Sequence, residues 1–400
     1  MRQRIITITD CLFPTRSGVL VQADLLAEGF AARGHESVMA GPAAPGPDVE
    51  RYDQSRPYRT VRLPSMRNPM ARGEFIPRRA KAALRDLMEQ FSPTVILGQD
   101  PGLGPLAAGD VAQQVGVPYV HVHHVHLELS VSFAPSWPPL RWGARKLIIR
   151  AFRRACRAAD CVIAVSEPIQ AMLEGLGVRT PIRVVRNAID TRAFCECGPP
   201  ATAEDGSPLL EGPYLLFAGR LGADKPVGLL IDAFDRLDSA GMSLVIAGSG
   251  PEKEALRRRA AASPKRDRIA FLGWVDRTER LPRLYRGAYA VVLPSACEGY
   301  SLSAIEALAC GAPIVVARGG GLLALGEWVP EALWFEPGSV ESLAAALQAL
   351  ISDRCAYHAA LRTGRLAVQE YSLDRMVDRY LEIIDEVTAG RCRAAAAPAR

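Results

Sequence analysis

The feature that most constrains the fold is an alternation of short apolar strands and longer helical stretches that runs along the chain twice. Apolar runs such as residues 3–9, 94–98 and 161–166 alternate with helical segments, and after a break rich in Pro, Gly and acids at residues 195–213 the alternation restarts with residues 214–219. Apolar strands bounded by Gly or Pro and separated by helices are typical of parallel sheets that are covered on both faces. The sequence therefore predicts an α/β protein with two doubly wound, Rossmann-like domains.

The chain of 400 residues is long enough for two such domains. We expect an N-terminal domain over residues 1–195, a linker over 196–212 and a second domain over 213–370. Residues 371–390 form a helix with no strand after it, which we expect to cross back to the first domain, and residues 391–400 form a tail. Because open α/β sheets bind ligands at the carboxyl ends of their strands, the site is expected in a cleft between the two domains.

The net charge is distributed unevenly between the two halves of the chain. Residues 1–195 carry 25 Lys and Arg against 17 Asp and Glu, a net +8, whereas residues 196–400 carry 23 against 26, a net −3. The N-terminal half is therefore the one expected to face an anionic partner.

The nine cysteines contain no C-x-x-C pair, which argues against a disulfide framework or a structural zinc site. No apolar run approaches the ~18–20 residues that span a bilayer, and the N-terminal apolar stretch is too short for a signal peptide, so we expect a cytoplasmic protein.

Two carboxylates, Glu298 and Glu306, flank a run of small residues that follows the apolar strand at 288–294. One interpretation is structural: Ser303 caps a helix with Glu306 as its capping-box partner, and Glu298 is an ordinary loop carboxylate. The other interpretation is functional. The first-turn amides of the helix would hold a phosphate, and Glu306, about one turn further, would accept hydrogen bonds from sugar hydroxyls.

Two cations favour the functional interpretation. Arg220 and Lys225 lie in the loop after the first strand of the second domain, again at a carboxyl end. Converging on a helix terminus, they would neutralise a pyrophosphate and stabilise its charge as it leaves. Carboxylates on both sides of a phosphate site suit a ligand that is anionic in the middle and rich in hydroxyls at both ends, namely a nucleotide sugar.

The order of these motifs resembles the C-terminal domain of the retaining glycosyltransferases of family 4, which have the GT-B fold. The resemblance rests on GRLGADK (219–225), VIAGSGP (245–251), FLGW (271–274) and the E-x7-E segment EGYSLSAIE (298–306). In the first half, residues 9–37 are similar to the opening of that family. Three further segments are most similar to the branch of diacylglycerol glucosyltransferases, sulfoquinovosyltransferases and related mannosyltransferases: LPSMRNP (63–69), QDPGLGPLA (99–107) and VPYVHVHHVHLE (117–128).

The resemblance implies a role for each matching residue. Arg220 and Lys225 would hold the pyrophosphate, Glu298 would contact the transferred sugar, and Glu306 would bind the ribose. His124 would lie beside the reacting centre as the fourth catalytic residue, with Glu298, Arg220 and Lys225. The remaining donor-binding positions are Gly18, in a tight turn near the phosphates, Trp274 and Val275 near the base, and Gly299, Tyr300, Ser301 and Leu302 at the phosphates.

The implied reaction moves a hexosyl group from a nucleotide-diphosphate sugar to an acceptor hydroxyl with retention of configuration, without a metal or other cofactor. The expected partners are this donor and an acceptor, and not a nucleic acid. The acceptor has two alternatives, a membrane lipid such as diacylglycerol and a soluble sugar or small-molecule aglycone. Departures from the family pattern at Pro226, Ser301, Leu127 and Ser130 keep both alternatives open.

Two other functions have some support in the sequence. Gly248 and Gly250 follow a strand, as in a dinucleotide-binding oxidoreductase, but Lys253 takes the place of the third glycine of that fingerprint. A non-catalytic protein that binds nucleotide sugars could use the same cleft. Detectable turnover of a donor would exclude this last reading.

The segment HVHHVHLE (121–128) raises the question of a metal site. On an extended strand His121 and His123 face one side and His124 and His126 the other, so no more than two of them readily converge. No D-x-D pair is present to carry a metal–nucleotide complex. We therefore expect one catalytic or sugar-binding histidine among bystanders, and no metal.

Residues 141–157 contain seven basic residues and no acid. Wound as a helix, they would place Trp142, Ile148, Ile149 and Phe152 on one apolar face. The plain interpretation is a helix packed on the core with a solvated basic side. The alternative is a surface that holds the protein reversibly on the anionic inner face of a membrane, as a peripheral protein.

Overall fold

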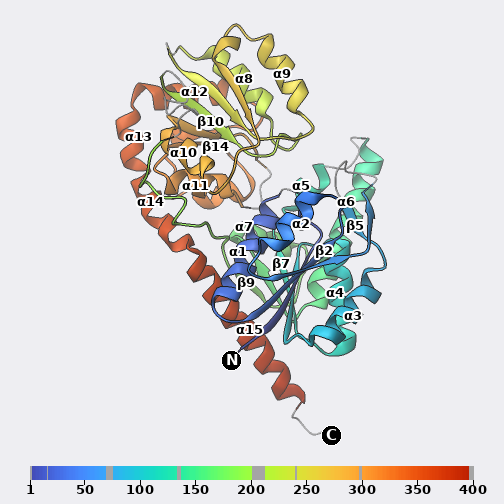
Figure 1. The fold of residues 1–400 in the computed structure, drawn as a ribbon. Helices are drawn as coiled ribbons and strands as arrows, with labels where there is room; N and C mark the ends of the chain where they lie inside the picture. Colours follow the sequence, from blue (N-terminus) through green and yellow to red (C-terminus); the bar gives the residue numbers. More distant parts are fainter. Residues whose placement is uncertain are drawn as a thin grey trace. The chain divides into compact units, whose positions relative to one another are not determined.

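The computed structural model describes residues 2–15, 17–68, 75–132, 137–200, 212–238, 241–296 and 300–395 (Figure 1). Within these ranges the chain divides into two compact units. Unit 1 spans Met1–Ala188 and Leu373–Arg400, and unit 2 spans Ile189–Ser372. The first unit therefore ends at Ala188 rather than at residue 195, and it includes the C-terminal helix.

Unit 1 is built on a seven-stranded parallel sheet with the strand order β3-β2-β1-β6-β7-β8-β9. Its strands are β1 (Arg4–Thr9), β2 (Glu36–Pro42), β3 (Arg59–Leu63), β6 (Val95–Gln99), β7 (Tyr119–His123), β8 (Cys161–Ala164) and β9 (Ile182–Val184), with a separate antiparallel pair, β4 (Ser65–Arg67) and β5 (Phe75–Pro77). Its helices are α1 (Gly18–Ala32), α2 (Pro47–Gln54), α3 (Ala80–Phe91), α4 (Leu103–Val115), α5 (Leu127–Ser132), α6 (Pro138–Ala158), α7 (Glu167–Gly175) and α15 (Leu373–Ala395). Strands β6, β7 and β8 are buried along their whole length, as their apolar sequences predict.

The C-terminal helix α15 packs on α1 of unit 1. A Cβ atom added at Gly29 of α1 would lie 2.4 Å from Cγ2 of Val377, so only glycine allows this close approach. Arg33 forms ion pairs with Asp374 at 3.1 Å and Asp378 at 3.0 Å. These contacts join the last helix of the chain to the first.

Unit 2 is built on a six-stranded parallel sheet with the order β12-β11-β10-β13-β14-β15. Its strands are β10 (Tyr214–Ala218), β11 (Ser243–Ala247), β12 (Ile269–Gly273), β13 (Ala290–Leu293), β14 (Ile314–Ala317) and β15 (Trp334–Phe335). Its helices are α8 (Val227–Arg236), α9 (Lys253–Ala261), α10 (Arg280–Gly287), α11 (Leu302–Ala309), α12 (Val340–Ser352), α13 (Arg354–Ala360) and α14 (Arg362–Val368), with short 3-10 turns at Arg266–Arg268, Gly320–Leu325, Glu331–Leu333 and Gln369–Tyr371. In each unit Figure 1 shows helices on both faces of the sheet, which confirms the predicted doubly wound architecture.

Candidate active site

In each sheet the strand order reverses next to the first strand of the unit. Strand β1 pairs with both β2 and β6, and β10 pairs with both β11 and β13. Loops that leave the carboxyl ends at such a reversal run to opposite faces of the sheet, and the space between them is where α/β proteins bind ligands. Arg220 and Lys225 lie in the loop after β10, and Ser301 and Leu302 lie where α11 begins after β13, so these four predicted donor residues lie on the two segments that flank the reversal in unit 2.

The loop after β10 is fixed in place by its backbone. The amides of Gly219 and Leu221 donate to the carbonyls of Ala247 at 3.0 Å and of Ser249 at 2.9 Å. Arg220 forms an ion pair with the buried carboxylate of Asp224 at 2.6 Å, which orients its guanidinium. The loop then enters α8 through Pro226, the residue before the helix. Both predicted cations therefore extend from a rigid loop.

Gly248 and Gly250, the two glycines of the G-S-G segment, hold this same loop. A Cβ atom at Gly248 would lie 1.8 Å from the carbonyl oxygen of Gly219, and one at Gly250 would lie 2.2 Å from that of Leu221. Only glycine permits these approaches. The G-x-G pattern that suggested a dinucleotide site thus has a packing role beside Arg220.

The start of α11 corrects the capping-box interpretation. The residue before the helix is Ser301, not Ser303, and Ser303 instead donates from Oγ to the carbonyl of Ala218 at 3.1 Å, tying α11 to the end of β10. Ser301 is buried, and among the described residues its Oγ has no hydrogen-bond partner. Unpaired first-turn amides and an unpaired buried hydroxyl are a suitable environment for phosphate oxygens. Glu298 and Gly299, which precede this turn, lie outside the described residues.

Glu306 is buried, with 2% of its surface exposed, and it is held by two side chains that the sequence analysis did not identify. The hydroxyl of Tyr285, from α10, donates to one carboxylate oxygen at 3.1 Å, and Arg277, from the loop after β12, forms an ion pair with the other. Burial beside this carboxylate raises the pKa of Tyr285, which stays protonated as a donor. The same loop carries Trp274, which is 54% exposed, and the half-buried Val275. The loop after β12 therefore carries both the residues that are predicted to bind the base and the arginine that pairs with Glu306, the residue predicted to bind the ribose.

In unit 1 the predicted histidine lies one strand away from the strand reversal. His124 follows β7, is buried, and has Nε2 2.6 Å from Oε1 of Gln99 at the end of β6. Burial lowers the pKa of His124 to about 4, so its imidazole is neutral near pH 7. Its backbone amide donates to Asp100 at 2.8 Å. Gly18, the other predicted residue of this unit, is the first residue of α1, whose N-terminus Ser17 caps through a bond from the amide of Leu20.

Two carboxylates at the same reversal were not identified from the sequence. Asp10 follows β1 and accepts a hydrogen bond from the amide of Gly104 at 3.0 Å, while Asp100 follows β6. Burial raises the pKa of Asp10 to about 6 and that of Asp100 to about 7, and for Asp100 the charge of Asp10 adds to the effect. An acid in the loop that follows a buried strand, the pattern from which Glu298 was predicted, also occurs at these two positions.

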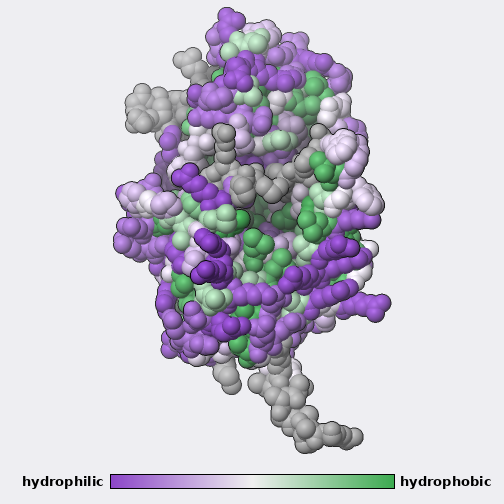
Figure 2. All heavy atoms as spheres, turned by 90° about the vertical axis from the view of Figure 1, so that its right-hand side faces the viewer, coloured by the Kyte–Doolittle hydropathy of each residue, from purple (hydrophilic) through white to green (hydrophobic). Residues whose placement is uncertain are grey.

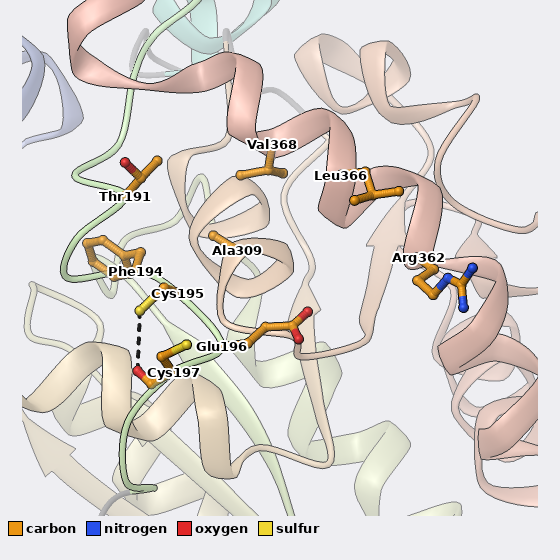
Figure 3. A pocket seen from close by; sticks show the side chains of 9 residues that line it. All are labelled: Thr191, Phe194, Cys195, Glu196, Cys197, Ala309, Arg362, Leu366 and Val368. Atoms are coloured by element: carbon orange, nitrogen blue, oxygen red, sulfur yellow. Dashed lines mark hydrogen bonds between the residues drawn. The ribbon is translucent and has the colours of Figure 1, made fainter.

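A separate cavity of about 780 Å³ lies in unit 2 (Figure 3). Its lining consists of Thr191, Phe194, Cys195, Glu196, Cys197, Ala309, Arg362, Leu366 and Val368. Ala309 is the last residue of α11, so the cavity adjoins the end of that helix opposite to the predicted phosphate-binding turn. It contains none of the predicted donor residues.

No helix in the described part of the chain is both long and apolar enough to cross a membrane.

Comparison with known families agrees with this geometry. The model described as Glycosyltransferase Family 4 matches residues 16–193, and the model described as Glycosyl transferases group 1 matches residues 203–366. Two parallel α/β units together with these family matches define a glycosyltransferase of the GT-B fold. The chain belongs to the family 4 glycosyltransferases.

Three characterised or named relatives illustrate the range of this family. The sulfoquinovosyl transferase SQD2 of Arabidopsis thaliana is 28% identical over 66% of this chain and 51% of its own length, so the match spans about half of that protein. A GDP-mannose-dependent phosphatidylinositol dimannoside mannosyltransferase of Mycobacterium tuberculosis is 27% identical over 80% of both chains. A 2-deoxystreptamine glucosyltransferase of Streptomyces kanamyceticus is 30% identical over 66% of this chain and 70% of its own.

Among solved structures, the Anabaena protein HepE in complex with UDP-glucose shares the fold. It superposes with a TM-score of 0.76 at 17% sequence identity and covers 96% of this chain and 100% of its own.

Proposed function

We propose that this protein transfers a hexosyl group from a nucleotide-diphosphate sugar to an acceptor hydroxyl with retention of configuration, with unit 2 binding the donor and unit 1 the acceptor. The observation that carries the proposal is the reversal point of unit 2. There Ser303 ties the start of α11 to β10, whose following loop bears Arg220 and Lys225. The complex of HepE with UDP-glucose supports a nucleotide sugar as the ligand of such a site.

In this proposal the protein supplies charge where the leaving diphosphate develops it. Arg220 and Lys225 neutralise the phosphates, and the first-turn amides of α11 donate to them, so catalysis needs no divalent cation. Glu298 contacts the transferred sugar and Glu306 binds the ribose hydroxyls. His124, neutral at pH 7, acts as a hydrogen-bonding group beside the reacting sugar. With no carboxylate assigned as a nucleophile, the acceptor attacks from the face on which the phosphate leaves, and the phosphate takes the acceptor proton.

Loss of a cation or of the sugar-binding acid tests this assignment. Lys225→Ala and Glu298→Ala should each lower turnover by about 10²–10³, since one electrostatic contact to a developing charge has that effect. Arg258→Ala, which removes an exposed arginine of α9, should leave the rate unchanged. Hydrolysis or transfer of UDP-glucose and GDP-mannose is measured for each variant with and without EDTA, after circular dichroism has shown a native fold. Near-normal rates in both site variants would refute the assignment, and a loss in EDTA that Mn²⁺ restores would refute metal independence.

For the acceptor we propose a membrane lipid such as diacylglycerol, reached by a peripheral protein on the cytoplasmic face of a membrane. The support is α6. Its only buried residues are Phe152, Ala155 and Cys156, near its end, whereas Trp142 and Leu147 are 63% and 68% exposed. Figure 2 views the side on which Figure 1 draws α6, and hydrophobic residues lie there between hydrophilic ones. The relative that acts on a phosphatidylinositol mannoside supports the same acceptor class.

Most of the predicted apolar face of this helix does not pack on the core, which argues against the plain interpretation of residues 141–157. Trp142 does not pack with Phe152 against the core, and Ile148 and Ile149 are only half-buried. The ammonium of Lys146 instead lies 3.5 Å from the centre of the Trp142 ring. Exposed apolar and basic side chains on one helix are the composition expected of a segment that rests on an anionic bilayer. A soluble acceptor is the second candidate, favoured by the relative named for 2-deoxystreptamine.

A further inference from the structure

The histidines of β7 have a partner that the sequence did not suggest. His121 and His123 lie on the same side of the strand, as predicted, and helix α6 brings Cys156 against them. One potential ligand atom from each of the three residues lies within 4.8 Å of the other two, and all three side chains are fully buried. Phe152, one turn before Cys156, packs edge-on against His123 with ring centres 4.4 Å apart. The cluster therefore lies where α6 joins the sheet.

The two imidazoles satisfy each other only in part. Nε2 of His121 lies 3.3 Å from Nδ1 of His123, within reach of one hydrogen bond whose direction depends on the tautomer. In the described part of the chain, Nδ1 of His121 and Nε2 of His123 have no hydrogen-bond partner. A neutral imidazole carries one proton, so any tautomer in which the rings bond to each other leaves one buried N–H and one buried lone pair unpaired.

The same geometry suits a metal ion. Two nitrogens that bind one tetrahedral metal at ~2.0–2.1 Å lie ~3.3–3.4 Å apart, which matches the observed separation. Two imidazoles and a thiolate are the donors that Zn²⁺ prefers, and hard cations such as Mg²⁺ avoid them. With three protein ligands, the fourth position of a zinc ion is usually taken by water.

We propose that His121, His123 and Cys156 bind Zn²⁺ and that the ion fastens α6 to β7 in the core of unit 1. Binding deprotonates the thiol, and the released proton goes to solvent. The ion holds the buried end of α6, from which the exposed basic part of the helix extends. This site does not depend on the proposed transfer reaction, and it replaces the expectation that these two histidines are bystanders.

The test uses the full-length protein without a polyhistidine tag, refolded in the presence of Zn²⁺ and freed of excess metal. Elemental mass spectrometry should find about one zinc per chain. Cys156→Ser and His121→Gln should each bind Zn²⁺ at least tenfold more weakly. Cys161→Ser is the matched control, because Cys161 is a buried cysteine of the same unit outside the cluster, and it should retain the metal.

Refolding with Co²⁺ gives a second readout that needs no variant to fold. A cobalt ion on the cluster should show a thiolate-to-metal charge-transfer band in the wild-type protein, and the band should persist in Cys161→Ser. Wild-type protein that is folded but metal-free after refolding with either ion would overturn the proposal. Equal zinc content in wild-type and Cys156→Ser protein would overturn it as well.

Discussion

Glu306 is a carboxylate removed from water and held by side chains from two other elements. Tyr285 donates to one of its oxygens from α10, and Arg277 pairs with the other from the loop after β12. Because Arg277 lies three residues after Trp274, a base bound at this loop and a ribose bound at Glu306 would be recognised by connected groups. A buried ion pair that loses one partner leaves an uncompensated charge, so Arg277 also stabilises the site.

This arrangement predicts the effect of changing Glu306. Glu306→Gln keeps the size of the side chain but loses the charge that strengthens hydrogen bonds from ribose hydroxyls. Since a hydrogen bond to a charged group contributes about 1.5–3 kcal/mol, the donor KM should rise by roughly 10- to 150-fold, with a smaller change in kcat. Arg280→Ala, at an exposed position near the same loop, should leave the donor KM unchanged. An unaltered donor KM in a folded Glu306→Gln variant would show that Glu306 does not bind the donor.

The raised pKa of Asp100 predicts that the stability of the protein depends on pH. Its pKa of about 7 in the folded protein lies above that of an unfolded aspartate, so the folded state holds more protons. Stability is therefore greater when Asp100 is protonated and falls as the pH rises through 7. Between about pH 6.5 and 8 this group alone lowers the free energy of unfolding by about 1 kcal/mol. His121, His123 and His124 act in the opposite direction, because they are neutral in the folded protein and lose protons only in the unfolded state.

Urea denaturation across this pH range, followed by fluorescence, measures the effect. Asn accepts the same bond from the amide of His124 without titrating, so Asp100→Asn should lose the contribution of Asp100 and keep that of the histidines. Across this range the free energy of unfolding of the wild-type protein should therefore fall by about 1 kcal/mol relative to that of the variant. Equal slopes in the two proteins would contradict the raised pKa.

Among the elements, helix α6 is the one on which the proposal of a membrane-lipid acceptor rests. Arg154 forms an ion pair with Asp110 at 2.7 Å, and Arg153 donates to the carbonyl of Leu176 at 2.6 Å, so reversing either charge would also disturb packing. Arg141 and Arg150 are exposed and suit the test better. Each basic residue near an anionic surface contributes about 1 kcal/mol, so Arg141→Glu with Arg150→Glu should weaken binding to anionic vesicles at least tenfold.

Sedimentation with vesicles of phosphatidylglycerol and phosphatidylcholine, in low and high salt, checks this prediction. Binding of the wild-type protein should be reversed by salt. Arg258→Ala, in unit 2, serves as the control and should bind as the wild type does. If the wild-type protein fails to bind anionic vesicles even in low salt, the acceptor is to be sought among soluble compounds.

The elements were more predictable from the sequence than the contacts between them. Apolar runs bounded by Gly or Pro identify the parallel strands, because a strand covered on both faces must be apolar throughout. The position of Arg220 and Lys225 was also predictable, because the end of the apolar strand β10 marks the start of the loop that carries them. The partners of Glu306 could not, because Arg277 and Tyr285 reach it from separate elements. The same limit applies to Cys156, which meets His121 only through the docking of α6.

At the scale of the whole molecule, two α/β units carry different halves of the proposed reaction. Unit 2 bears the cations and the helix start that suit a diphosphate, and unit 1 bears His124 and the raised-pKa acids Asp10 and Asp100. One family model matches each half of the chain. The central claim is that together they transfer a sugar with retention of configuration.

The most direct test follows the anomeric configuration of the sugar as it leaves the donor. The protein is incubated with UDP-glucose or GDP-mannose, both α-linked, and the first released or transferred sugar is observed by proton NMR before mutarotation. We expect the α-anomer to appear first, and we expect Lys225→Ala to abolish its release. Initial release of the β-anomer would contradict retention. Failure of the folded protein to turn over any donor in a panel of nucleotide sugars would contradict the assignment as a transferase.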